Sequence, residues 1–189
     1  MKRFGVTQIK KGRENGFSLI EAMFAIAILG IGLCALMAMF ARAVYVTQYA
    51  QEDQIARQKA RQALEAAVSA RNDTTLTFSQ LQNVSNGGIF KDGFGTLYLA
   101  GPNGIPGTTS DTANPDYLQL PGPDGKMGTA DDRYIYLNNY QRQILITNIY
   151  NSDGTLNTDM RKIAVTVRIT SESRGTHDYT ITSYITRFN

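Results

Sequence analysis

The chain has 189 residues and a formal net charge of +3, from nineteen Lys and Arg residues and sixteen Asp and Glu residues. Residues 1–16 hold five of the basic residues and one acidic residue, which leaves fourteen basic and fifteen acidic residues, a net charge of −1, in the remainder. A near-neutral remainder gives no argument for a nucleic-acid partner, and we expect none. Cys34 is the single cysteine, so an intramolecular disulfide is excluded.

An uncharged stretch of twenty residues runs from Ala22 to Ala41. At about 1.5 Å of rise per residue, a helix of this length crosses the roughly 30 Å hydrocarbon core of a bilayer. Basic residues before an apolar segment place that side in the cytoplasm, so the sequence predicts a single span with the globular part outside the inner membrane.

Two simpler interpretations compete with a functional span. A secretory signal peptide has a shorter apolar region and a small-residue cleavage site on its far side, whereas this stretch continues past Arg42 into a helical pattern. A plain single-pass anchor leaves Glu21 unexplained. An acid at the entrance to an apolar helix is costly unless it finds a partner, so Glu21 is a candidate functional residue.

Residues 16–21 read GFSLIE, which resembles the cleavage and methylation motif of type IV prepilins and type II secretion pseudopilins. The resemblance implies cleavage after Gly16 by prepilin peptidase, which removes residues 1–16 as a leader, and N-methylation of Phe17. It also implies that Glu21 pairs with the N-terminal amine of a neighbouring subunit. An ammonium and a carboxylate at low dielectric offset part of each other's desolvation.

The continuation, residues 27–33, resembles the minor pilins of the V type and the I-type minor pseudopilin of type II secretion. This implies a structural subunit, not an enzyme, that waits in the bacterial inner membrane and joins other pilin subunits in a pilus or pseudopilus in the periplasm or at the cell surface. Many major pilins have a proline where Ala38 stands. Gly30 and Gly32 either loosen the helix, at about 1 kcal/mol each, or let neighbouring helices approach closely.

The transmembrane and filament-core segment, residues 17–41, is followed by a predicted extramembrane helix over residues 42–72, which contains no Gly or Pro. Its charged face contacts either other subunits or solvent. An apolar stripe at helical spacing should hold the globular domain; it comprises Ile55, Ala56, Ala60, Ala63, Leu64, Ala67 and Val68.

Residues 73–189 are expected to form a globular β domain. Alternating apolar residues predict strands near 143–149, 163–170 and 179–186, and their short connections favour an antiparallel meander. The fold class is therefore α+β: the pilin-like layout of a long N-terminal helix, membrane-spanning in its first half, packed against a C-terminal antiparallel sheet. Residues 101–133 are rich in Gly, Pro, Asp and Asn and are predicted to be a long irregular loop.

Within this loop, residues 101–111 resemble residues 122–132. The second copy carries Asp124, Asp131 and Asp132 as candidate calcium ligands, because Ca²⁺ prefers six to eight oxygen ligands on a sharply turning chain. This copy is similar to the calcium loop of the major pseudopilins, although its spacing is not that of an EF-hand. The alternative is two β-turns with Asp and Gly in favoured positions.

No catalytic constellation is evident, and His177 is expected to be a solvent-exposed residue of a turn between strands. A second functional hypothesis makes residues 101–133 a recognition surface, at the tip of a filament, for an adhesion target, DNA or a secreted substrate. A third is a mere membrane anchor with a sensor-like domain, which requires the cleavage motif to be accidental.

Overall fold

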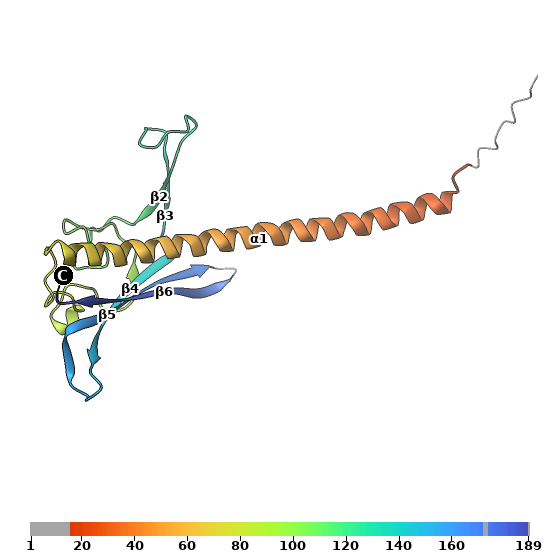
Figure 1. Ribbon diagram of the computed structural model, residues 1–189. Coiled ribbons are helices and arrows are strands. Elements are labelled where there is room, and N and C mark those ends of the chain that lie inside the picture. The colour runs from red at the N-terminus through yellow and green to blue at the C-terminus, as the bar shows by residue number, and fades with distance from the viewer. Residues whose placement is uncertain (1–15, 172–173, 189) are drawn as a thin grey trace, which may run out of the picture. The chain divides into compact units, whose positions relative to one another are not determined.

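A computed structural model describes residues 16–171 and 174–188, so all of the expected leader except Gly16 lies outside the described residues. The chain divides into two units, Met1–Gln48 and Tyr49–Asn189. The elements, labelled in Figure 1, are α1 (Leu19–Asn72), the 3₁₀ turn η1 (Val84–Asn86), β1 (Gly95–Thr96), β2 (Tyr117–Leu120), β3 (Arg133–Tyr136), β4 (Tyr140–Tyr150), β5 (Leu156–Ser171) and β6 (Gly175–Thr186).

The described part of the first unit is almost entirely helical. α1 is long enough, and apolar enough near the N-terminus, to cross a membrane, and none of that apolar window is buried. The helix runs through Gly30 and Gly32 without a break. A Cβ at either glycine would meet no heavy atom within 4 Å, so packing within this chain does not require them. The predicted helix is confirmed, and a role for these glycines in close packing needs a neighbouring molecule.

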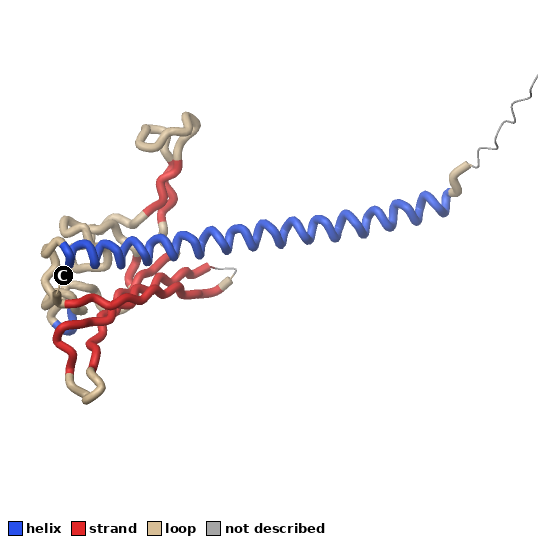
Figure 2. Tube along the Cα trace, in the orientation of Figure 1, coloured by secondary structure: helices blue, strands red, loops and turns tan. Residues whose placement is uncertain are grey.

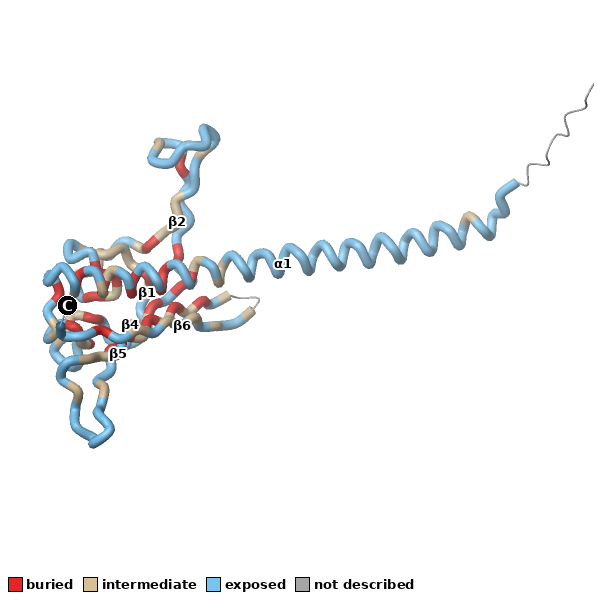
Figure 3. Tube along the Cα trace, in the orientation of Figure 1, coloured by how far each residue is buried: buried red, intermediate tan, exposed pale blue. Residues whose placement is uncertain are grey.

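In the second unit, one face of α1 forms half of the core. The predicted stripe is confirmed, because Ala56, Ala60, Ala63 and Ala67 are fully buried and the flanking apolar residues are buried or half-buried. Alanine lets a helix backbone lie close to a sheet, since it adds only one methyl group. Figure 3 shows the buried residues gathered between this part of α1 and the strands.

The helix ends where the sequence predicts. Thr74 adopts a left-handed conformation with φ of 60°, and the Leu76 N–H donates to the Ala70 carbonyl at 2.8 Å. Such a reversal satisfies carbonyl groups that the last turn of a helix leaves without partners. The chain then turns back toward the sheet.

The main sheet has four antiparallel strands in the order β1-β4-β5-β6 (Figure 2). Its core face is supplied above all by Ile163, Val165, Val167 and Ile169 of β5, all fully buried. These residues alternate with more exposed ones, as predicted. Together with α1, this sheet gives the α+β layout expected from the sequence.

A two-stranded hairpin formed by β2 and β3 was not predicted. Strand β2 of this hairpin lies within residues 101–133, which the sequence predicts to be an irregular loop. The prediction of an irregular loop is therefore wrong for residues 117–120. The Tyr117 ring meets the rings of Tyr134 and Tyr136 edge to face at 5.0 and 6.1 Å. In Figure 1 this hairpin and the main sheet lie on opposite sides of the C-terminal part of α1. Isolated hairpins are marginal, so an anchor to the rest of the unit is needed.

Candidate functional sites

The start of α1 holds the residues of the predicted processing motif. Residues 16–18 are not helical, α1 begins at Leu19, and the Ala22 N–H donates to the Ser18 carbonyl at 3.1 Å. A serine before the first helical residue with a glutamate three positions later is the spacing of a capping box. Phe17 is 74% exposed. The bond between Gly16 and Phe17 therefore lies in a non-helical, exposed segment directly before a helix.

Glu21 lies in the first turn of α1 and is exposed. The partial positive charge at a helix N-terminus favours an acid in this position. No described residue forms an ion pair with Glu21. In an apolar environment its carboxylate therefore needs a partner from outside the described part of this chain, or it relies on the helix N-terminus alone.

The two similar segments, which we name the first turn loop (residues 101–111) and the second turn loop (residues 122–132), have the same backbone course. In the first, the Gly104 N–H donates to the Gly101 carbonyl at 2.9 Å; Gly125 and Gly122 repeat this bond at 3.0 Å. The left-handed glycines match closely, with φ of 68°, 88°, 69° and 85° at Gly104, Gly107, Gly125 and Gly128. The sequence repeat is therefore also a structural repeat.

The last aspartate closes each turn loop. The Asp111 carboxylate accepts the Gly107 N–H at 2.9 Å and the Thr108 N–H at 3.3 Å. At the corresponding position, the Asp132 carboxylate accepts the Gly128 N–H at 2.6 Å. Each carboxylate thus closes the last turn of its loop.

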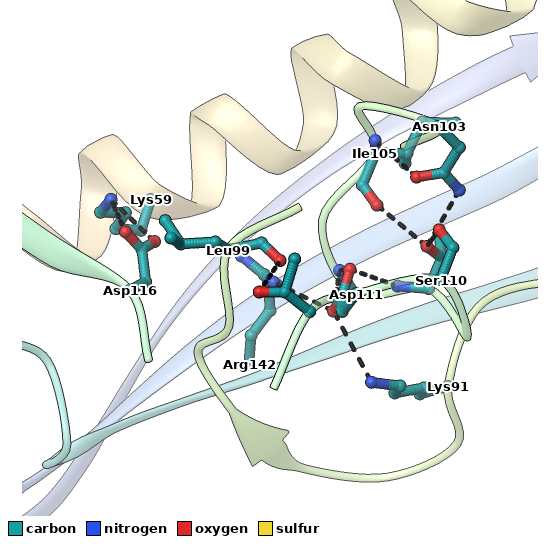
Figure 4. A network of polar contacts seen from close by, with 12 residues as sticks. Lys59, Lys91, Leu99, Asn103, Ile105, Ser110, Asp111, Asp116 and Arg142 are labelled. Atoms are coloured by element: carbon teal, nitrogen blue, oxygen red, sulfur yellow. Dashed lines mark hydrogen bonds and ion pairs between the residues drawn. The ribbon is translucent and has the colours of Figure 1, made fainter. Parts of the chain in front are cut away.

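The surroundings of the two aspartates differ, and Figure 4 shows those of Asp111. The side chain of Asp111 is 2% exposed and lies 3.9 Å from the guanidinium of Arg142 and 3.8 Å from the ammonium of Lys91. Burial lowers the pKa of the Arg142 guanidinium, and the nearby Asp111 and Asp116 oppose that shift. Asp132 instead accepts a hydrogen bond from the side-chain amide of Gln119, which carries no charge.

The predicted calcium ligands serve as hydrogen-bond acceptors within the second turn loop. Asp124 accepts the Lys126 N–H at 2.8 Å, and Asp131 accepts the Thr129 hydroxyl at 2.7 Å. That hydroxyl is the main cause of a lowered pKa at Asp131. Across residues 16–171 and 174–188, no three His, Cys, Asp or Glu side chains are arranged to hold a metal ion. The three aspartates do not form a metal cage in this conformation, and calcium binding stays a prediction.

A buried ion pair attaches the β2–β3 hairpin to α1. Lys59 Nζ lies 2.8 Å from the carboxylate of Asp116, and both side chains are about one-tenth exposed. Sequence reasoning did not identify this pair. In the sequence, Lys59 stands next to Ala60 and one helical turn from Ala56 and Ala63, so it lies on the edge of the apolar stripe. This position is the sequence feature from which a location near the core could have been predicted.

His177 lies in β6 and not in a turn, so the expectation of an exposed turn residue is wrong. Its ring is half-buried, with its centroid 5.2 Å from that of the Tyr49 ring. The strand begins at Gly175, four residues before Tyr179, from which apolar alternation becomes visible in the sequence.

An apolar helix that is long enough to cross a membrane, an exposed non-helical junction before it and a C-terminal antiparallel sheet fit a membrane-anchored protein. Residues 11–37 match the family model described as the prokaryotic N-terminal methylation motif. This motif supports a relationship of the N-terminal segment to type IV pilins and pseudopilins. Comparisons with curated proteins and with solved structures found no match. The motif implies processing by prepilin peptidase and assembly with other pilins.

Proposed function

We propose that this chain is a minor pilin or pseudopilin, cleaved after Gly16, methylated at Phe17 and assembled into a type IV pilus or a related filament. The main supporting observation is that the methylation motif leads directly into an apolar helix whose side chains are not covered by any described residue. Leu19 and Met37, for example, are 81% and 73% exposed. Burying a large apolar side chain contributes about 1.5–3 kcal/mol, so insertion into lipid or among neighbouring helices is strongly favoured.

The proposal assigns the domains accordingly. Residues 1–16 are the leader, residues 17–41 the membrane and filament-core helix, residues 42–72 the extramembrane helix, and residues 73–189 the globular part outside the inner membrane. The protein acts as a structural subunit rather than as an enzyme. Pilin and type II secretion filaments both fit this organisation.

Within this proposal, Glu21 pairs with the methylated N-terminal amine of a neighbouring subunit. The rival role is local: Glu21 stabilises the start of its own helix through the capping-box spacing with Ser18. Glu21→Gln separates the two roles. The amide keeps an oxygen that can accept hydrogen bonds from the first turn, but it loses the charge that an ion pair requires.

The test co-expresses the chain with prepilin peptidase and the other filament subunits. Mass spectrometry is expected to find a mature N-terminus at Phe17 carrying one added methyl group. Glu21→Gln is expected to remain membrane-inserted and cleaved but to fall at least about tenfold in sheared filaments, as loss of a desolvated ion pair implies. Glu65→Gln, at an exposed position of the same helix, is the matched control. Normal incorporation of Glu21→Gln would contradict the ion-pair role, and an uncleaved N-terminus would contradict the whole proposal.

A binding module at a filament tip is the second candidate, favoured by the β2–β3 hairpin, on which Tyr134, Ile135 and Tyr136 are all about half exposed. The first turn loop is unsuitable for deletion, because Ile105 and Thr108 are buried in the core. Leu120 and Arg133 are paired directly, so residues 121–132 can be replaced by Asn-Gly to leave a two-residue hairpin. Filaments that form normally but no longer bind a target support this module, whereas loss of filaments supports an assembly role for the hairpin.

A further inference from the structure

A cavity of about 580 Å³ in the second unit brings three guanidinium groups together. Arg71 comes from the last turn of α1, Arg161 from β5, and Arg187 from the segment after β6. None of the described residues that line the cavity is acidic. Three cations from three separate elements around one hollow, without an acid in its wall, create a positive potential there.

These arginines donate some of their hydrogen bonds to groups within the chain. Few of those groups are charged, so most of the positive charge of the arginines is not neutralised. Arg161 donates to the carbonyls of Phe78 and Leu81, and Arg71 donates to the carbonyl of Arg187. Carbonyl groups supply partial charges only. Among the described residues, the one carboxylate that forms an ion pair with these arginines is Asp159, which lies 3.8 Å from the Arg187 guanidinium and outside the cavity wall. Within the described part of the chain, the three arginines therefore exceed their acidic partners by two charges.

Two further observations indicate that the arginines are not fully compensated. Arg71 Nε is buried and has no hydrogen-bond partner among the described residues. Burial lowers the pKa of the Arg161 guanidinium, which shows that its charge is poorly solvated. An anion in the cavity would give Arg71 Nε a hydrogen-bond partner and would stabilise the buried charge of Arg161. Charge-assisted hydrogen bonds to a guanidinium are stronger than hydrogen bonds to neutral acceptors.

The rest of the wall suits hydroxyl groups. The neutral polar residues of the wall are Thr77, Ser79, Asn148 and Asn157, whose hydroxyl and amide groups can both donate and accept hydrogen bonds. The Thr77 and Ser79 hydroxyls bond each other, and the Asn157 amide bonds Asn151 and the Asp159 N–H, so these groups have only part of their capacity left for a ligand. Phe78 adds an aromatic ring, which stacks under the Arg161 guanidinium at 4.3 Å. The volume lies within the range of about 300–1,000 Å³ that is usual for small-molecule sites.

We propose that this cavity binds a sugar acid, with the carboxylate held by Arg71, Arg161 and Arg187 and the ring hydroxyls held by the neutral polar wall. The source is either a free uronic acid or the end of an acidic polysaccharide chain. The site consists only of residues of the second unit, and the proposal does not depend on the filament role proposed above.

The test uses the full mature chain in a non-ionic detergent, with isothermal titration of glucuronate, galacturonate, oligogalacturonate, glucose and inorganic phosphate. Binding of a sugar acid is expected with a Kd on the order of 1 mM or lower. The affinity should fall as NaCl rises from about 50 to about 500 mM, since salt screens the guanidinium charges. Tighter binding of oligogalacturonate than of galacturonate assigns the site to a polysaccharide, and equal binding assigns it to a free sugar acid.

Arg187→Gln is the informative variant, because Arg187 is exposed and its loss should leave the fold intact. It is expected to weaken binding at least about fivefold, as loss of one charge-assisted bond implies. Arg133→Gln, at an exposed position on β3, is the matched control and should bind normally. The proposal is overturned if no sugar acid binds, if glucose or phosphate binds as well as glucuronate, or if both variants weaken binding equally.

Discussion

The two turn loops follow one backbone course in two environments. Both close on an aspartate that accepts backbone N–H groups, and both place glycines at matching left-handed positions. The first turn loop lies in the core, where Asp111 faces two cations; the second lies at the end of an exposed hairpin, where Asp132 faces an amide. The local sequence therefore determines the turn, while the surroundings determine whether its carboxylate belongs to an ion pair.

The largest expected effect comes from removing the buried acid. Asp111→Ala should lower the free energy of unfolding by about 3–4 kcal/mol, because Arg142 stays buried without its carboxylate and two N–H groups lose their acceptor. Urea unfolding of the mature chain, followed by circular dichroism, measures the loss. Asp132→Ala is the matched control. It should lower the free energy of unfolding clearly less, because no buried cation among the described residues is paired with Asp132. Equal losses would remove the distinction between the two loops.

A smaller effect tests what the loops share. Gly104→Ala and Gly125→Ala should each lower the free energy of unfolding by about 1 kcal/mol, since both residues have φ near 70° and a Cβ would meet nothing within 4 Å. The cost is then one of backbone conformation and not of packing. The same unfolding measurement applies. A cost at Gly104 several times that at Gly125 would show that the buried environment changes the turn itself.

A third effect concerns pH and the second turn loop. The hydrogen bond from Gln119, helped by backbone N–H groups, holds the pKa of Asp132 below its ordinary value of 3.8. A lowered folded-state pKa contributes stability that is present above pH 3.8 and is lost as pH falls through the folded-state value. Thermal unfolding from pH 6 down to about pH 2.5 should therefore be less steeply pH-dependent in Asp132→Asn than in the parent chain. Superimposable pH profiles would contradict this role of Asp132.

The smallest expected effect is that of calcium. If Asp124, Asp131 and Asp132 rearrange to bind Ca²⁺, millimolar calcium should raise the melting temperature, because a ligand that binds only the folded state stabilises it by mass action. Asp124→Asn should remove that increase, whereas Asp92→Asn, an exposed acid away from the second turn loop, should not. Absence of both a thermal shift and a binding heat at millimolar calcium would refute the calcium prediction.

Much of the fold was predictable because its signals are local. The uncharged stretch from Ala22 to Ala41, the alanine stripe and the alternation in β5 each follow from one short periodicity, and the structure confirms all three. The methylation motif was likewise recognisable, because it is a short linear segment that residues 11–37 match, whereas cleavage after Gly16 stays a prediction. The assembly role of Glu21 stays a prediction, since its partner does not lie among the described residues.

The rest depended on residues far apart in the sequence. The number of acids drew attention to the second turn loop. Of the aspartates in the two turn loops, however, the one buried beside a cation is Asp111, because β4 brings Arg142 to it. The pair Lys59–Asp116 and the arginine cavity likewise join residues from separate elements. By itself the sequence determined the long apolar helix, the methylation motif and the three long strands of the main sheet, since short-range sterics and hydrophobic periodicity set them. Only the tertiary structure decided which charges are buried and paired, because burial depends on which distant segments meet.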